Sequence, residues 1–154
     1  MKIFVSMAFV LLLAGTASHS HATQITEKGK TMSAKGSFEV RLVPQKEDVA
    51  PVGRMVIDKT YLGDIKGTGI GQMISKRTEG GTAVYFAIEE FSGTVNGKSG
   101  TFTLIHKGYL SKESQMLEVE VLGGSGSGDL VGISGSMTIV QDAEGHTYEF
   151  KYEL

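Results

Sequence analysis

Glycine-rich turns divide the chain, from residue 35 to its end, into short runs of β-type sequence. Eight runs can be marked, at residues 35–43, 52–61, 65–77, 82–95, 99–110, 115–122, 130–141 and 146–154. Turn-forming pairs such as Gly80-Gly81 and Asn96-Gly97 separate them. No run has the i, i+3, i+4, i+7 apolar spacing of an amphipathic helix. The pattern therefore predicts an all-β fold, a sandwich or a barrel, with little helix.

The first 22 residues have the composition of a secretory signal peptide. Lys2 supplies the positive start, and residues 3–13 form an apolar run too short to span roughly 30 Å of hydrocarbon. Ser20-His21-Ala22 has small residues at the −3 and −1 positions, which predicts cleavage after Ala22. We expect a periplasmic or secreted protein that is not membrane-bound after cleavage.

The remaining chain is long enough for one domain with a real core. We expect a flexible N-terminal segment over residues 23–34, because it is polar and lacks periodicity, and a single barrel domain over residues 35–154. The chain has no cysteine, which excludes disulfides, iron–sulfur clusters, thiolate zinc sites and a cysteine nucleophile. Only His106 and His146 follow the predicted cleavage site, so no metal or other cofactor is expected.

The charged residues form no basic patch, and the formal net charge is −2. Nucleic acid is therefore not an expected partner. Lys59, Lys66, Lys76 and Arg77 fall on separate turns and strands, so we expect them on an ordinary solvated surface.

The Asn96-Gly97 turn sets a register for the two runs that flank it. A two-residue turn places Ile88 opposite Ile105 and Phe91 opposite Phe102. Both faces of residues 82–91 are then largely apolar. One face would fill the interior, and the other needs a cover, most simply another copy of the chain. We expect a homo-oligomer.

The last two runs form a second hairpin if residues 142–145 are its loop. Tyr148 then lies opposite Ile139, and Tyr152 opposite Gly135, so the apolar faces coincide. His146, Tyr148 and Tyr152 share one face, with polar tips on apolar bodies. They could line the mouth of a small-molecule cavity, or they could be core residues whose hydroxyls reach the surface.

Glu89 and His106 are the strongest candidates for chemistry. The predicted register makes them diagonal neighbours on one face, within reach of a hydrogen bond. Such a pair in an apolar enclosure suits general acid–base catalysis, and Tyr85 on the same face could orient a carbonyl or hydroxyl group. The alternative is a buried polar pair that only specifies the register.

Two glycine-rich segments resemble functional motifs in letters only. Residues 123–128 lack the lysine and the following helix of a phosphate-binding loop, and they lack the strand–helix setting of a nucleophile elbow. Gly67, Gly69 and Gly71 lie on one face of a single run, which indicates a coiled strand or a close approach of backbone. Hydrolysis is not indicated.

A series of short motifs runs through the chain in a fixed order: Gly36-Ser37-Phe38-Glu39-Val40, Gly53-Arg54-Met55 with Asp58-Lys59, Gly63-Asp64, Gly97-Lys98-Ser99-Gly100-Thr101-Phe102, His106-Lys107-Gly108, Gly132-Ile133-Ser134-Gly135-Ser136-Met137 and His146-Thr147-Tyr148-Glu149-Phe150. In this order they resemble the bacterial domain of unknown function 3224. The resemblance implies a closed eight-stranded antiparallel meander barrel like that of allene oxide cyclase and dirigent proteins. It implies no activity, although proteins of this wider barrel type bind or guide small apolar molecules, often as oligomers.

Three functions remain open at this point. The leading hypothesis is a barrel without catalytic activity that binds a small, mostly apolar ligand. Its predicted ligand-binding residues are Tyr85, Glu89, His106, His146, Tyr148 and Tyr152. The second is an isomerase or cyclase in which Glu89 and His106 act as acid and base. The third is a structural or interaction protein whose barrel is filled by its own side chains.

Overall fold

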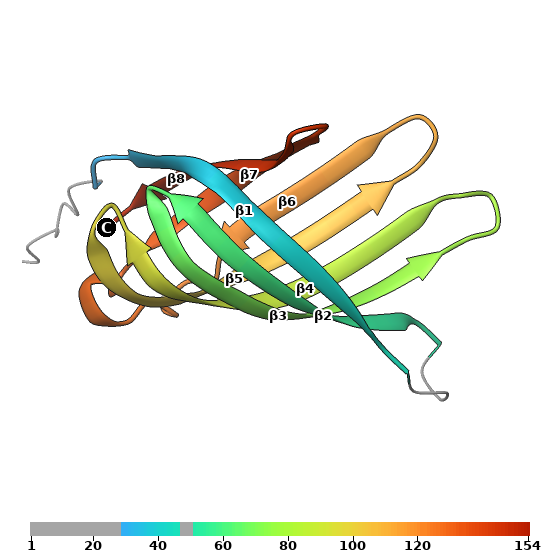
Figure 1. Cartoon of the computed structure of the whole chain (residues 1–154), viewed down its shortest axis with the longest axis horizontal. Coiled ribbons are helices and arrows are strands. Elements are labelled where there is room, and N and C mark those ends of the chain that lie inside the picture. The colour runs from blue at the N-terminus through green and yellow to red at the C-terminus, as the bar shows by residue number, and fades with distance from the viewer. Residues whose placement is uncertain (1–28, 47–50) are drawn as a thin grey trace, which may run out of the picture.

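The strands close into a barrel. The computed structural model describes residues 29–46 and 51–154, so the predicted signal peptide lies outside the described residues. Within them, eight antiparallel strands follow chain order around the barrel, and β8 pairs with β1 to close it (Figure 1). The all-β prediction and the closed eight-stranded meander are confirmed.

The strands run over Met32–Gln45 (β1), Gly53–Gly63 (β2), Ile65–Arg77 (β3), Ala83–Val95 (β4), Lys98–Leu110 (β5), Gln115–Val121 (β6), Ser134–Asp142 (β7) and Gly145–Glu153 (β8). Both predicted hairpin registers are confirmed: Ile88 pairs with Ile105 across β4 and β5, and Tyr148 with Ile139 across β7 and β8. These registers fix which residues point inward.

Two strands start three or four residues from the predicted position, whereas the other boundaries agree within two residues. Strand β1 begins at Met32, inside the segment expected to be flexible, because Met32 pairs with Tyr152 in the β1–β8 ladder that closes the barrel. The predicted seventh strand, which was to start at Leu130, begins instead at Ser134. Residues Gly128–Leu130 form a short 3₁₀ turn, and Leu130 is apolar because its side chain is buried in the core.

The barrel is packed unevenly along its length. The core gathers toward the end where the β4–β5 and β6–β7 connections lie (Figure 1). Its buried members are Ala34, Phe38, Tyr61, Ile65, Phe91, Val95, Phe102, Leu104, Val119, Leu130, Ile133, Met137, Tyr148, Phe150 and Tyr152. Leu130 and Ile133, from the β6–β7 connection, are both fully buried and close this end. The other end is not filled in this way.

Part of the outer surface is apolar. Ile70 and Ile74 on β3, Phe86 and Ile88 on β4, and Ile105 on β5 are all exposed, with Ile88 60% accessible. Ile74 pairs with Phe86 and Ile88 with Ile105, so these side chains form one continuous patch, called here the outer apolar face. The predicted two-sided apolar character of this region is present, and its cover by another copy stays a prediction. Among the described residues, no helix has the length and hydropathy to cross a membrane.

Candidate functional site

A cavity of about 1010 Å³ occupies the half of the barrel that the core leaves open. Its walls are mostly aliphatic side chains and methionines, including Ile57, Met55, Met73, Leu117 and Ile139. The exposed residues Lys76, Arg77 and Gln115 also line it, and they lie at strand ends beside the β3–β4 and β5–β6 turns. These turns lie at the end of the barrel opposite the β4–β5 turn (Figure 1), so the cavity opens away from the packed core.

Lys59 and His106 line the floor of the cavity. They belong to a buried polar cluster, which we define as Lys59, Tyr61, Glu89 and His106. Lys59, Glu89 and His106 are only 5%, 0% and 3% exposed. The ammonium of Lys59 donates to Oε2 of Glu89 at 2.7 Å and to the hydroxyl of Tyr61 at 3.3 Å. That hydroxyl in turn donates to Oε1 of Glu89 at 2.6 Å. Both carboxylate oxygens are thus bound within the cluster.

A glycine on the neighbouring strand leaves space for this cluster, and two aromatic rings pack against its ammonium group. Gly69 pairs with Lys59 across β2 and β3, and a Cβ on Gly69 would lie 2.0 Å from Oε1 of Glu89. The carboxylate therefore occupies space that any other residue at position 69 would fill. The rings of Phe38 and Tyr61 lie 4.8 Å and 5.6 Å from Nζ of Lys59, where their π faces attract the cation. The predicted close approach at the alternating glycines is present here.

The cluster holds Glu89 as a carboxylate. Burial alone would raise the pKa of Glu89, but the interactions with His106 and Lys59 outweigh it and lower the pKa to about 2. The pKa of Tyr61 shifts the opposite way, well above its ordinary value, because of burial and the neighbouring negative charge of Glu89. At neutral pH the cluster therefore contains an ionised Glu89 and a protonated Tyr61.

His106 meets the carboxylate from the next strand. Its Nε2 lies 3.0 Å from Oε2 of Glu89, the distance of an ion pair, but this buried nitrogen makes no hydrogen bond of good geometry within the described residues. The proximity itself assigns the proton, because an unprotonated nitrogen so close to a carboxylate oxygen would be repelled. Nε2 is therefore the protonated nitrogen. The predicted neighbourhood of Glu89 and His106 is present.

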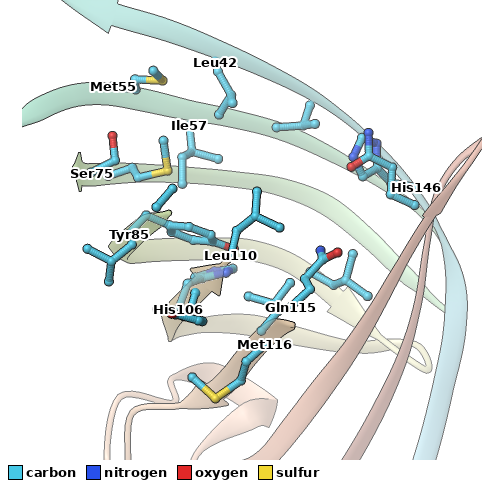
Figure 2. A pocket seen from close by; sticks show the side chains of 18 of the residues that line it. Leu42, Met55, Ile57, Ser75, Tyr85, His106, Leu110, Gln115, Met116 and His146 are labelled. Atoms are coloured by element: carbon cyan, nitrogen blue, oxygen red, sulfur yellow. The ribbon is translucent and has the colours of Figure 1, made fainter. Parts of the chain in front are cut away.

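The other predicted ligand residues divide between the two halves of the barrel. Tyr85, His106 and His146 line the cavity (Figure 2). The ring of Tyr85 covers Gly108 on β5, where a Cβ would lie 1.9 Å from Cε1 of the tyrosine. His146 stacks on Phe38 with ring centroids 5.0 Å apart. Glu89 lies behind Lys59 and His106 and does not line the cavity itself.

Tyr148 and Tyr152 lie in the packed half. The hydroxyl of Tyr148 accepts the backbone N–H of Ile65 at 2.9 Å and donates to the carbonyl of Leu62 at 3.1 Å. The side-chain amide of Asn96 donates to the hydroxyl of Tyr152 at 2.9 Å. Both hydroxyls form hydrogen bonds within the fold, and neither residue lines the cavity. Tyr148 and Tyr152 are therefore core residues and not ligand-binding residues.

Lys59 is the site residue that the sequence analysis placed wrongly. It was expected on a solvated surface, but it is buried and paired with Glu89. The signal was present in the alternation of β2, where Ile57, Lys59 and Tyr61 share the inward face. A lysine between two buried apolar residues on one face of a strand indicates a buried charge that needs a partner.

Within the residues that the structure describes, there is no group of three His, Asp or Glu side chains that could hold a metal ion.

Comparisons with known proteins agree on one family. The family described as "Protein of unknown function (DUF3224)" matches residues 34–152. The chain is also similar to a solved structure, that of a protein with unknown function from the DUF3224 family of Shewanella oneidensis MR-1. The two share 35% identity and superpose with a TM-score of 0.72, over 80% of this chain and 96% of that one. No curated protein matches the chain.

Proposed function

The chain belongs to the DUF3224 family, whose function is unknown, and we propose from the site itself that it binds a small, mostly apolar ligand inside the barrel. The observation that carries this proposal is the cavity of about 1010 Å³, which is lined largely by aliphatic side chains and methionines. Apolar concave sites with a few convergent polar groups are the usual form of small-molecule sites.

The packing of the barrel supports binding over a purely structural role. In the part of the chain that the structure describes, buried core residues fill the interior of one half of the barrel. The side chains that line the other half leave an open volume. A chain that needed only a stable barrel could fill both halves. Methionine walls suit an adaptable apolar site, because methionine is flexible and polarizable.

The isomerase or cyclase alternative is less well supported by the site. A carboxylate with a pKa of about 2 is a weak proton acceptor at neutral pH, and both oxygens of Glu89 already accept hydrogen bonds from Lys59 and Tyr61. Glu89 also does not line the cavity, so a substrate would reach His106 first. Acid–base catalysis by this pair remains the second candidate.

The signal-peptide pattern of residues 1–22 supports binding outside the cytoplasm as part of this proposal. The lack of cysteine is compatible with an exported protein, because the closed ladder of strands, and not disulfides, holds the fold together. N-terminal sequencing of the protein recovered from a cell-envelope fraction tests this part. We expect Thr23 as the first residue, whereas an intact Met1 on soluble cytoplasmic protein would contradict export.

Binding is tested with the neutral apolar dye Nile red and a matched pair of variants. We expect the purified protein to bind the dye with a blue-shifted emission. Ser75→Trp fills the cavity from β3, and overpacking of this kind should weaken dye binding about tenfold. Ile74→Trp introduces the same side chain on the outer face one residue away, and it should leave the affinity unchanged.

Native mass spectrometry of the freshly purified protein complements the titration. A retained small molecule that Ser75→Trp loses and Ile74→Trp keeps would support the proposal. Dye binding that both variants retain equally would contradict it, because the dye would then lie on the outer apolar face and not in the cavity.

A further inference from the structure

We propose that the natural ligand is an apolar carboxylic acid that enters head first, with its carboxyl group on Lys59 and His106 at the floor and its apolar body along the cavity walls. This inference rests on the proposed function and names the class of ligand for the same cavity.

The floor offers a hydrogen-bond donor that the fold does not use. An ammonium group has three N–H donors, and Lys59 uses one on Glu89 and one on Tyr61. The third has no acceptor among the described residues, and Lys59 is one of the residues that line the cavity. His106 also lines the cavity beside it, while its Nε2 lies 3.0 Å from Oε2 of Glu89. Buried donors of this kind require an acceptor.

The charged side chains that line the cavity favour a ligand whose head accepts hydrogen bonds. Lys59, Lys76 and Arg77 line it, and no aspartate or glutamate is among the described residues that do so. The carboxylate of Glu89 neutralises Lys59 from behind and stays out of the cavity. The charged side chains that line the cavity are therefore all cationic, and a low-dielectric enclosure strengthens a hydrogen bond from Lys59 to an acceptor there.

The floor and the mouth differ in what they would gain from an anion. Lys76 and Arg77 are exposed, and they already donate to the backbone carbonyls of Pro51 at 3.0 Å and Gly81 at 3.2 Å. An exposed ion pair there would gain little against water. Lys59 and His106 are removed from water, so a hydrogen bond at the floor has no such competitor.

Charge balance gives the inference a second consequence. Lys59 and Glu89 cancel one another, so an added carboxylate would be an uncompensated buried charge. The acid must therefore bring one proton into the site. The titratable side chains that face this region are Glu89 and Tyr85 on β4, Lys59 and Tyr61 on β2, and His146 on β8, while β6 presents Leu117 and Val119. Binding should consume one proton from solution.

The test uses the wild-type protein and three probes with the same chain: dodecanoic acid, methyl dodecanoate and dodecan-1-ol. We expect the acid to bind at least about tenfold more tightly than the ester, as a charge-assisted hydrogen bond predicts. Calorimetry in two buffers of different ionisation enthalpy should show uptake of about one proton for the acid and none for the ester.

Two variants locate the carboxyl group. Lys59→Met with Glu89→Gln removes both charges together, so neither is left buried alone, and the preference for acid over ester should fall to within about twofold. Lys76→Ala with Arg77→Ala removes the cations of the mouth and should keep the preference. Nile red binding by both variants shows that the cavity survives, and the wild-type measurements decide the question if the floor variant does not fold.

The possible failures are distinguishable. If neither Nile red nor any of the three probes binds, the proposed function fails and the inference fails with it. If the dye and the ester bind as well as the acid, or the acid binds without proton uptake, the proposed function stands and the head-first acid is overturned. Loss of the acid preference in the mouth variant alone would also overturn it.

Discussion

The ammonium of Lys59 and the carboxylate of Glu89 form an ion pair at 2.7 Å, with side chains that are 6% and 0% exposed. The two residues come from β2 and β4, and Gly69 on the intervening strand gives the carboxylate its space. Desolvation of two such charges is repaid only when further hydrogen bonds satisfy them, as Tyr61 does here. The pair therefore contributes both to the stability of the barrel and to the proposed binding site.

Removal of one partner of this pair should be costly. Glu89→Gln leaves the ammonium of Lys59 buried without its counter-charge, and we expect a loss of about 3–5 kcal/mol in the free energy of unfolding. The double variant Lys59→Met with Glu89→Gln should recover a large part of that loss. Urea unfolding of the four proteins of this cycle measures the coupling. Additive losses in the double variant would show that the pair is not coupled as the geometry requires.

Acid should weaken the fold through the same carboxylate. The pKa of Glu89 is about 2 in the folded protein against an ordinary value of 4.5, so its contribution to stability is fully present above about pH 4.5. It is lost as the pH falls from there toward 2, since the unfolded chain then binds a proton that the folded chain does not. Urea unfolding across this range should show a steeper decline for the wild type than for Glu89→Gln. Parallel declines would contradict the assignment.

A methyl group at Gly69 should disturb the cluster directly. In Gly69→Ala the new Cβ would lie 2.0 Å from Oε1 of Glu89 and 3.1 Å from the ring of Tyr61, so the carboxylate must move. We expect a loss of about 1–3 kcal/mol in the free energy of unfolding. Gly80→Ala is the matched control, because a Cβ there meets its nearest atom at 3.9 Å in an exposed turn. Equal stability of the two variants would mean that Glu89 is not held as described.

Local patterns in the sequence predict most of the fold. The two-residue turn at Asn96-Gly97 and the loop at residues 142–145 set the hairpin registers, because strand side chains alternate with a strict period of two. The boundary at Leu130 was wrong because a short apolar stretch reads the same whether it forms a strand or inserts into a core. The early start of β1 was missed because its partner, β8, lies at the other end of the sequence.

The sequence predicted one part of the candidate site, the pair of Glu89 and His106, but not the position of Lys59. Glu89 and His106 lie on adjacent strands of one hairpin, so the register alone brought them together. Lys59 reaches them from β2, across β3, and no single hairpin relates it to Glu89. The volume of the cavity also depends on how the side chains of eight strands fill the interior, which the hairpin registers leave open.

The outer apolar face should mediate self-association. Phe86 and Ile88 are 47% and 60% exposed there, and contiguous apolar surface of this kind marks interaction sites. We expect the wild type to run as an oligomer in size-exclusion chromatography with light scattering, and Ile88→Lys to shift it toward the monomer. Thr147→Lys adds the same charge on the exposed side of β8 and should leave the oligomer intact. A wild type that is monomeric at all concentrations would contradict the prediction.

The hydroxyl of Tyr148 should matter for stability and not for binding. It bonds the backbone of Ile65 and Leu62, so Tyr148→Phe leaves a buried N–H without its acceptor and should cost about 1–3 kcal/mol in the free energy of unfolding. Nile red affinity should stay within about twofold of the wild type, because Tyr148 does not line the cavity. Tyr85→Phe is the complementary change, on a residue that does line it, and should leave stability nearly unchanged. A fall in dye affinity for Tyr148→Phe at unchanged stability would return Tyr148 to the ligand-binding residues.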